Sequence, residues 1–139
     1  MPVAVKDFHD AHAGLREGSE LLVEAARALP GVGLEEREAL RSRATTFLQD
    51  TVVPHTKLDE HVLYPEVANR LGDPLATATM SYDHVAIRGL IDDLVCADID
   101  DLDRLQQLLY GLFALIGVHI WKEERLYLAM LESPGWPAQ

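Results

Sequence analysis

The strongest constraint on the fold of this chain is a histidine inside each of four apolar helical stripes. These histidines are His12, His55, His84 and His119. An acid follows two of them by four positions: Asp59 after His55, and Glu123 after His119. Residues i and i+4 share a helix face, about 6 Å apart along the axis. In "VPHTKLDEHVLYP" the expected stripe runs from Val52 through this pair to Val62. Burying unpaired imidazoles and carboxylates is costly, so the pattern predicts a binding partner in the core.

Apolar residues recur every three to four positions over four stretches, which predicts helices. The expected helices span about residues 5–29, 34–71, 74–96 and 100–132. No stretch alternates with a period of two, so we expect no strands. The short connections predict an all-α fold, an antiparallel up-down-up-down four-helix bundle. The histidines and acids within its apolar stripes add the expectation of a di-metal site in the core. We expect residues 1–139 to form one domain.

Glycine, proline and aspartate mark the expected helix ends. "PGVG" (30–33) and "SPGWP" (133–137) are expected to end the first and last helices, and "ADIDD" (97–101) offers N-caps for the fourth. Asp73 is the expected N-cap of the third helix, with Pro74 as its first residue. Pro54 and Pro65 lie inside the second helix, where they predict a kink or a break. The stripe of the last helix is expected to continue from Glu123 to Leu126.

An internal repeat relates the two halves of the chain. "HAGLR" (12–16) resembles "HVAIR" (84–88), and "HTKLDEHVL" (55–63) resembles "HIWKEERLY" (119–127). Each half therefore carries a lone histidine followed by a histidine–acid pair. Two such halves facing each other in an antiparallel bundle would bring four imidazoles and two carboxylates into one core layer.

Composition excludes several classes of partner. The formal net charge is −11, whereas nucleic acids and anionic membranes attract basic surfaces, so we expect neither as a partner. The longest nearly uncharged run, 105–120, is amphipathic and too short to span a bilayer. A single cysteine, Cys96, allows no disulfide within the chain. Together with the lack of an apolar signal-like segment in "MPVAVKDFHDAHAG", this favours a cytoplasmic location.

The donor types narrow the choice of metal. No thiolate belongs to the pattern, which excludes cysteine-type structural zinc. Mixed imidazole and carboxylate donors suit iron or manganese and are compatible with zinc. Two bridging carboxylates and two imidazoles per ion give four protein donors. A solvent bridge makes five, leaving an octahedral ion one open position for a small diatomic or peroxide ligand.

The pattern H…HxxxD/E…H…HxxxE, carried by "PHTKLDEHVLYP" and "HIWKEERL", resembles the hemerythrin-like, or HHE cation-binding, domains. The resemblance extends from about Phe8 to Leu131, and the family signature HxxxEExxL(F/Y)P is closely matched over 55–65. It implies a four-helix bundle that holds two non-haem iron ions joined by an oxo or hydroxo bridge. Its implied metal ligands, with the two acids bridging, are His12, His55, Asp59, His84, His119 and Glu123.

The chain departs from this family in three respects. Oxygen-carrying members have a second histidine one turn from the third-helix histidine, whereas this chain has Met80 and Arg88 around His84. The incomplete set is similar to that of bacterial hemerythrin-like proteins that react with peroxide, oxygen or nitric oxide. Asp59 stands where glutamate is usual and is one methylene shorter, so Glu60 is an alternative ligand to it, as Glu124 is to Glu123. There are also extra histidines: His9 is an alternative or outer partner, and His61 is expected at the surface.

Several further residues are candidates for supporting roles. The tyrosines are expected to pack in the core or between helices, where one near the metals could donate a hydrogen bond or an electron; they are Tyr64, Tyr82, Tyr110 and Tyr127. Four acids are candidate acceptors for ligand N–H groups, although a solvated face also explains them: Glu60, Glu66, Asp83 and Glu124. Arg16 and Arg88 are expected to form salt bridges.

Two functions fit this pattern. The first is a di-iron redox enzyme that consumes hydrogen peroxide, or consumes O2 or NO with an external electron donor. The second is a carrier or sensor that binds O2, NO or iron without turnover. A metal-free bundle with buried polar residues is the third reading. Turnover of many equivalents per site separates the enzyme from the carrier.

Overall fold

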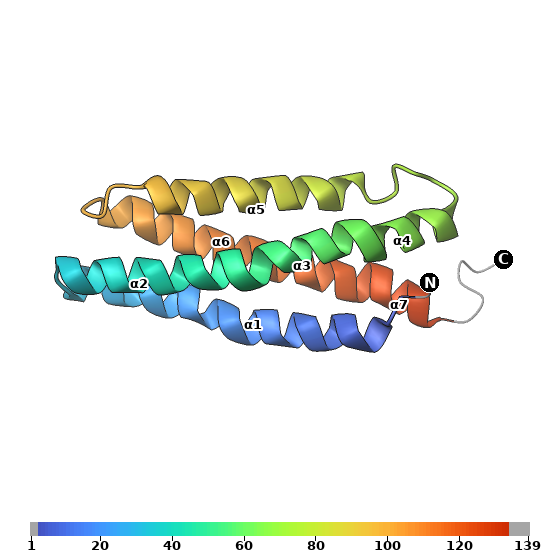
Figure 1. The fold of residues 1–139 in the computed structure, drawn as a ribbon, viewed down its shortest axis with the longest axis horizontal. Helices are drawn as coiled ribbons and strands as arrows, with labels where there is room; N and C mark the ends of the chain where they lie inside the picture. Colours follow the sequence, from blue (N-terminus) through green and yellow to red (C-terminus); the bar gives the residue numbers. More distant parts are fainter. Residues whose placement is uncertain (1–2, 134–139) are drawn as a thin grey trace.

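In a computed structural model, residues 3–133 form four long helical rods arranged side by side (Figure 1). The first and third rods are α1 (Val5–Ala28) and α5 (Ala78–Cys96). The second comprises α2 (Leu34–Phe47), α3 (Val53–Leu58) and α4 (Tyr64–Leu71), and the fourth comprises α6 (Leu102–Lys122) and α7 (Ala129–Glu132). No strand occurs in residues 3–133, so the predicted all-α bundle is confirmed.

The rods alternate in direction, as predicted for an up-down-up-down bundle. In Figure 1 the α1–α2 and α5–α6 connections lie at one end, and the α4–α5 connection lies at the other. Both α1 and α5 pack against α2 and against α6. None of the helices in residues 3–133 combines the length and the apolar character needed to span a bilayer.

The helix ends agree with the predicted signals except before the third rod. A short 3-10 turn (Leu29–Gly31) follows α1, Gly72 ends α4 at φ 65°, and the Asp101 side chain caps α6 by accepting from the Arg104 N–H. The predicted start at Pro74 is wrong, since α5 begins at Ala78. Asp73 Oδ1 instead accepts the Leu75 N–H at 2.9 Å in a local turn that competes with helix formation. Residues 134–137 of the expected last stop signal lie outside the described residues.

The two internal prolines are accommodated by π turns rather than by a break. π-helical segments at Leu48–Val52 and Asp59–Leu63 precede Pro54 and Pro65, and the rod stays helical to Leu71. A π turn holds one extra residue and bonds i→i−5, as the Tyr64 N–H does to the Asp59 carbonyl.

The π turns also change which side chains face the core. Val62 was predicted on the buried stripe but is 38% exposed, whereas Leu63 is fully buried. A third π segment, Glu123–Leu128, has the same effect, because Leu126 is 59% exposed and Leu128 is buried. Each extra residue advances the stripe by one position, so the 3.6-residue period fails after each acid.

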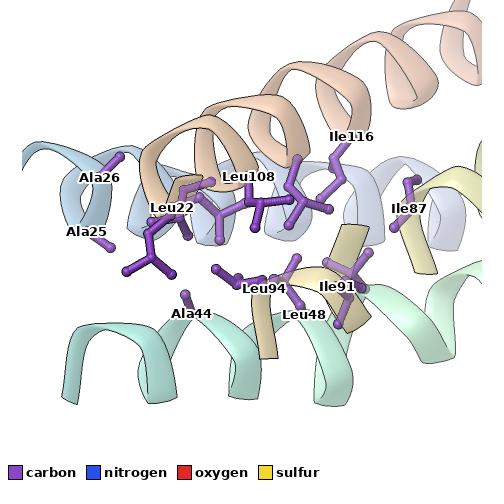
Figure 2. Close-up of a cluster of buried hydrophobic side chains, with 14 of the residues drawn as sticks. Leu22, Ala25, Ala26, Ala44, Leu48, Ile87, Ile91, Leu94, Leu108 and Ile116 are labelled. Carbon is purple, nitrogen blue, oxygen red and sulfur yellow. The ribbon is translucent and has the colours of Figure 1, made fainter. Parts of the chain in front are cut away.

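Two apolar clusters fill the bundle. The larger lies toward the α1–α2 and α5–α6 connections and includes Leu22, Leu48, Leu94 and Leu108 (Figure 2). The smaller lies toward the other end and includes Phe8, Tyr64, Met80 and Leu128. In every rod the histidine of the stripe falls between residues of one cluster and residues of the other. A polar layer therefore crosses the core between two apolar ones.

The close approach of α1 to α2 gives a stability prediction. A Cβ at Gly18 would lie 2.3 Å from the Phe47 ring, whereas a Cβ at Gly14 would meet nothing within 4 Å. We expect Gly18→Ala to lower the free energy of unfolding by about 1–3 kcal/mol through overpacking. Gly14→Ala should raise it by about 0.5–1 kcal/mol, since alanine favours helix. Chemical denaturation measures both, and equal gains would contradict the predicted contact.

Candidate metal centre

The structure brings the six predicted site residues together in the polar layer. Four of them have no exposed surface, His119 is 3% exposed and His55 is 9% exposed. We call these six residues the donor cluster: His12, His55, Asp59, His84, His119 and Glu123. The histidines of the two i,i+4 pairs lie in α3 and α6, and each acid directly follows its helix. The N–H of each acid still bonds to the carbonyl of its histidine, so the pattern holds at these positions.

The donor cluster divides into two sets that share both acids. One set is His12, His55, Asp59 and Glu123, and the other is Asp59, His84, His119 and Glu123; the donor atoms within each set lie within 4.8 Å of one another. The two oxygens of each acid face opposite histidine pairs. Asp59 Oδ1 lies 3.2 Å from His55 Nε2, and Oδ2 lies 3.2 Å from His84 Nε2. Glu123 Oε1 lies 3.0 Å from His12 Nε2, and Oε2 lies 3.3 Å from His119 Nε2.

Three further acids hold the outer nitrogens of the histidines. The Nδ1 atoms of three rings donate to these outer carboxylates: His12 to Glu124 (3.1 Å), His84 to Glu60 (2.8 Å) and His119 to Asp83 (2.9 Å). An ionised carboxylate only accepts, so each Nδ1 carries a hydrogen, and the Nε2 of a neutral ring turns its lone pair inward. Glu60 and Glu124 thus contact the outer faces of the rings and do not replace Asp59 or Glu123 in the centre.

Not all of the inward-facing atoms are satisfied by one another. His84 Nε2 and His119 Nε2 lie 3.0 Å apart, an arrangement that sets two lone pairs against each other when both rings are neutral. His55 Nε2 and Asp59 Oδ1 are close but poorly aligned, and both are buried without a hydrogen-bond partner. Buried polar atoms are normally paired. A cation between each histidine pair would satisfy these atoms, so the residues fit a metal.

When no metal is bound, protons on the imidazoles satisfy the inward-facing atoms. Burial alone would lower the pKa of His55 and His119, but the carboxylates of Asp59 and Glu123 outweigh it and raise the two values to about 9 and about 10. Burial likewise opposes ionisation of the two acids, yet the surrounding histidines hold their pKa values below the usual range. Metal binding must therefore displace protons from the imidazoles.

Tyr64 is a seventh contributor whose position was not predicted. Its hydroxyl donates to Glu123 Oε2 at 2.6 Å and lies 3.1 Å and 3.2 Å from the Nε2 atoms of His84 and His119. Burial and the neighbouring carboxylates Glu123 and Asp59 raise its pKa. The π turn before Pro65 brings this residue onto the buried face; the proline was the only hint of it in the sequence. Tyr82 and Tyr110 were expected to pack but are 74% and 41% exposed.

The remaining candidate residues lie outside the cluster. His61 is at the surface as expected, with Nδ1 donating to the Lys57 carbonyl. His9 reaches the cluster only through Glu124, to which its Nδ1 lies at 2.6 Å. Glu66 pairs with Arg70 rather than with a histidine. Arg16 lies 3.8 Å from Glu124, whereas Arg88 forms no ion pair with any residue in 3–133.

The fold and the donor cluster define a class: a four-helix bundle whose core layer of imidazoles and carboxylates is built for cations. The model of the hemerythrin HHE cation-binding domain matches residues 3–131. The chain belongs to this family, and the resemblance read from the sequence is confirmed. Comparison with curated proteins and with solved structures gives no match.

The raised histidine pKa values predict how the stability of the metal-free protein depends on pH. The pKa values of His55 and His119 are about 9 and about 10 in the folded protein, against about 6.5 when unfolded. Their contribution is fully present below pH 6.5 and is lost as pH rises through 9 and 10. Over that window the contribution of each histidine to the free energy of unfolding falls by at most about 1.4 kcal/mol per pH unit. Chemical denaturation between pH 6 and 10 should show the free energy of unfolding falling.

The acids act at the opposite end of the pH scale. Because the pKa values of Asp59 and Glu123 are lowered, their contribution is present above their unfolded pKa and is lost only as pH falls below it. The metal-free protein should therefore be most stable in mildly acidic solution. His61→Ala is the matched control and should keep the same profile, and a flat profile from pH 6 to 10 would contradict the pairing of the buried histidines.

Proposed function

We propose that this protein is a non-haem di-iron protein that reacts with small oxygen species or nitric oxide, with consumption of hydrogen peroxide as its foremost activity. The observation that carries the proposal is the opposed orientation of the two shared acids. Each presents one oxygen to each histidine pair, at 3.0–3.3 Å from an inward-facing nitrogen. This orientation supports two carboxylates that would each bridge two ions, with two imidazoles on each ion.

The donors favour iron. Imidazole and carboxylate suit iron and manganese, and no thiolate contributes, because Cys96 is exposed near the end of α5. Tyr64 places a third type of donor, a phenol oxygen, beside His84 and His119. An oxygen donor of this kind suits ferric iron, and we include it as a candidate fifth donor of that set.

The protein residues would hold, orient and shield the ions. Bound iron would supply exchange between ferrous and ferric states. The outer carboxylates fix the orientation of three imidazoles and increase their basicity. As long as its phenol is protonated, Tyr64 holds Glu123 in place through its hydroxyl. Disproportionation of two H2O2 to two H2O and O2 needs no further reductant. Net reduction of O2 or NO would need an external electron donor, which we propose as a partner for those reactions.

Burial restricts the substrate to small molecules. All six cluster residues are at most 9% exposed, so a bulky organic substrate cannot reach the inward-facing atoms. A surface pocket of about 470 Å³ between α4 and α5 has Glu60 and Tyr64 in its lining, together with apolar residues such as Pro65 and Val85. Since Glu60 and Tyr64 both contact cluster histidines, this pocket brings solvent within one side chain of the centre.

Metal analysis combined with a peroxide assay tests the proposed activity. Purified protein should contain about two irons per chain and show a visible ferric spectrum. Hydrogen peroxide should cause sustained release of O2 at half the molar rate of peroxide loss. A stable spectral adduct without turnover would contradict the enzyme and support a carrier or sensor, and manganese or zinc in place of iron would contradict the di-iron assignment.

Substitution of a shared acid tests the ligand assignment. Glu123→Ala should lose bound metal and peroxide consumption, because it removes one donor from each ion. In the metal-free protein it should also cost about 3–5 kcal/mol of stability, since the protonated histidines lose a buried counter-charge. His61→Ala, on the exposed face two residues after Asp59, should change none of these properties. Equal metal content in the two variants would show that the assigned ligands are wrong.

A further inference from the structure

The internal repeat permits a residue-by-residue comparison of the two proposed metal positions. The repeat aligns His12 with His84 and His55 with His119. The geometry of the two pairs is similar, with ring centroids 5.0 Å apart for His12 and His55 and 4.7 Å apart for His84 and His119. Differences in the surroundings therefore arise from the residues that differ between the halves.

The first difference concerns the outer carboxylates. Glu124 on His12 has its counterpart in Glu60 on His84, but the carboxylate on His119 has none. Asp83, which holds His119, directly precedes His84; the residue that directly precedes His12 is Ala11. Among residues 3–133 the ion pairs of His55 involve Nε2 alone. His55 is therefore the one cluster histidine in this range whose Nδ1 is not held by a carboxylate.

Two further residues on the His84–His119 side, Lys122 and Tyr64, have apolar counterparts in the other half. Lys122 donates to Asp83 Oδ2 at 2.6 Å and holds that carboxylate against His119. The counterpart of Lys122 is Leu58, which is 45% exposed. Tyr64 lies against His84 and His119, and its counterpart in the other half is Leu128, which has no donor atom.

We propose that the two metal positions are unequal, with the His84–His119 position loading first and the His12–His55 position holding its ion more weakly. The inference rests on the proposed two-metal function. A carboxylate on Nδ1 fixes the ring in its ligating orientation and increases the basicity of Nε2, so a held imidazole binds metal more tightly than a free one. Asp83 is the positioning residue that sets the difference, acting on the ion through His119.

Titration of metal-free protein with Co²⁺ against a competing chelator tests this inference. The wild-type protein should bind two ions per chain in two steps with affinities at least about tenfold apart. Asp83→Ala should weaken the tight step by about 10–100-fold, the usual effect of losing such a partner, and bring the two steps together. Ala11→Asp should tighten the weak step by supplying the missing acceptor.

Two matched variants separate positioning from a merely structural role. Asp83→Asn keeps an acceptor oxygen for His119 Nδ1 and should retain most of the tight step. Lys122→Met removes the ion pair but leaves the acceptor, so the order of loading should survive. Thermal unfolding of each metal-free variant checks its fold, and the Asp83 variants decide the question if Ala11→Asp does not fold.

The outcomes separate this inference from the function on which it rests. Two equal binding steps in the wild type, or an Asp83→Ala effect confined to the weak step, would overturn the inequality and leave a two-metal centre intact. Binding of one ion or none at saturating Co²⁺ would overturn the two-metal centre itself, and the inequality with it.

Discussion

The cost of burying two carboxylates governs the structure of this bundle. Asp59 and Glu123 have no exposed surface, and an isolated charge in such surroundings would cost several kcal/mol. Four imidazoles around them, one from each rod, remove that cost by carrying protons or by sharing cations. The outer carboxylates then fix the imidazoles. The centre therefore consists of two inner carboxylates, a surrounding layer of imidazoles and an outer layer of carboxylates. The four rods must keep their register because each supplies one ring to this layer.

Local spacing explains why most of the site was readable from the sequence. An i,i+4 pair faces one way on any α-helix. The backbone N–H groups of Asp59 and Glu123 still bond to the His55 and His119 carbonyls, so α-helical spacing holds within both pairs. His12 and His84 lie in stripes that are buried from Phe8 to Leu22 and from Met80 to Leu94. The repeat predicted that the two halves face each other, and the family resemblance then implied the six residues of the donor cluster. Glu60, Glu124 and His9 stayed open as alternatives until the tertiary contacts were known.

The parts of the site that the sequence did not predict depend on features with no strong local signal in the sequence. The π turns after Asp59 and Glu123 advance the stripe by one residue, which exposes Val62 and Leu126 and places Tyr64 on the centre. A period of 3.6 residues describes a regular α-helix, so it cannot show where a π turn inserts an extra residue. The hydrogen bond from His119 Nδ1 to Asp83 joins residues that are 36 positions apart and lie on different rods. Such pairs follow from helix rotation, which the pattern along one helix does not fix.

The placement of the polar layer between two apolar clusters has a consequence for the chain as a polymer. The large cluster and the small cluster are joined by all four rods, and the donor cluster draws on every one of them. Metal ions held there would tie four distant segments at one point and so remove conformational entropy from partly unfolded states, as a cross-link does. A chain with a single cysteine can form no internal disulfide, yet it can gain a comparable closure from its metal.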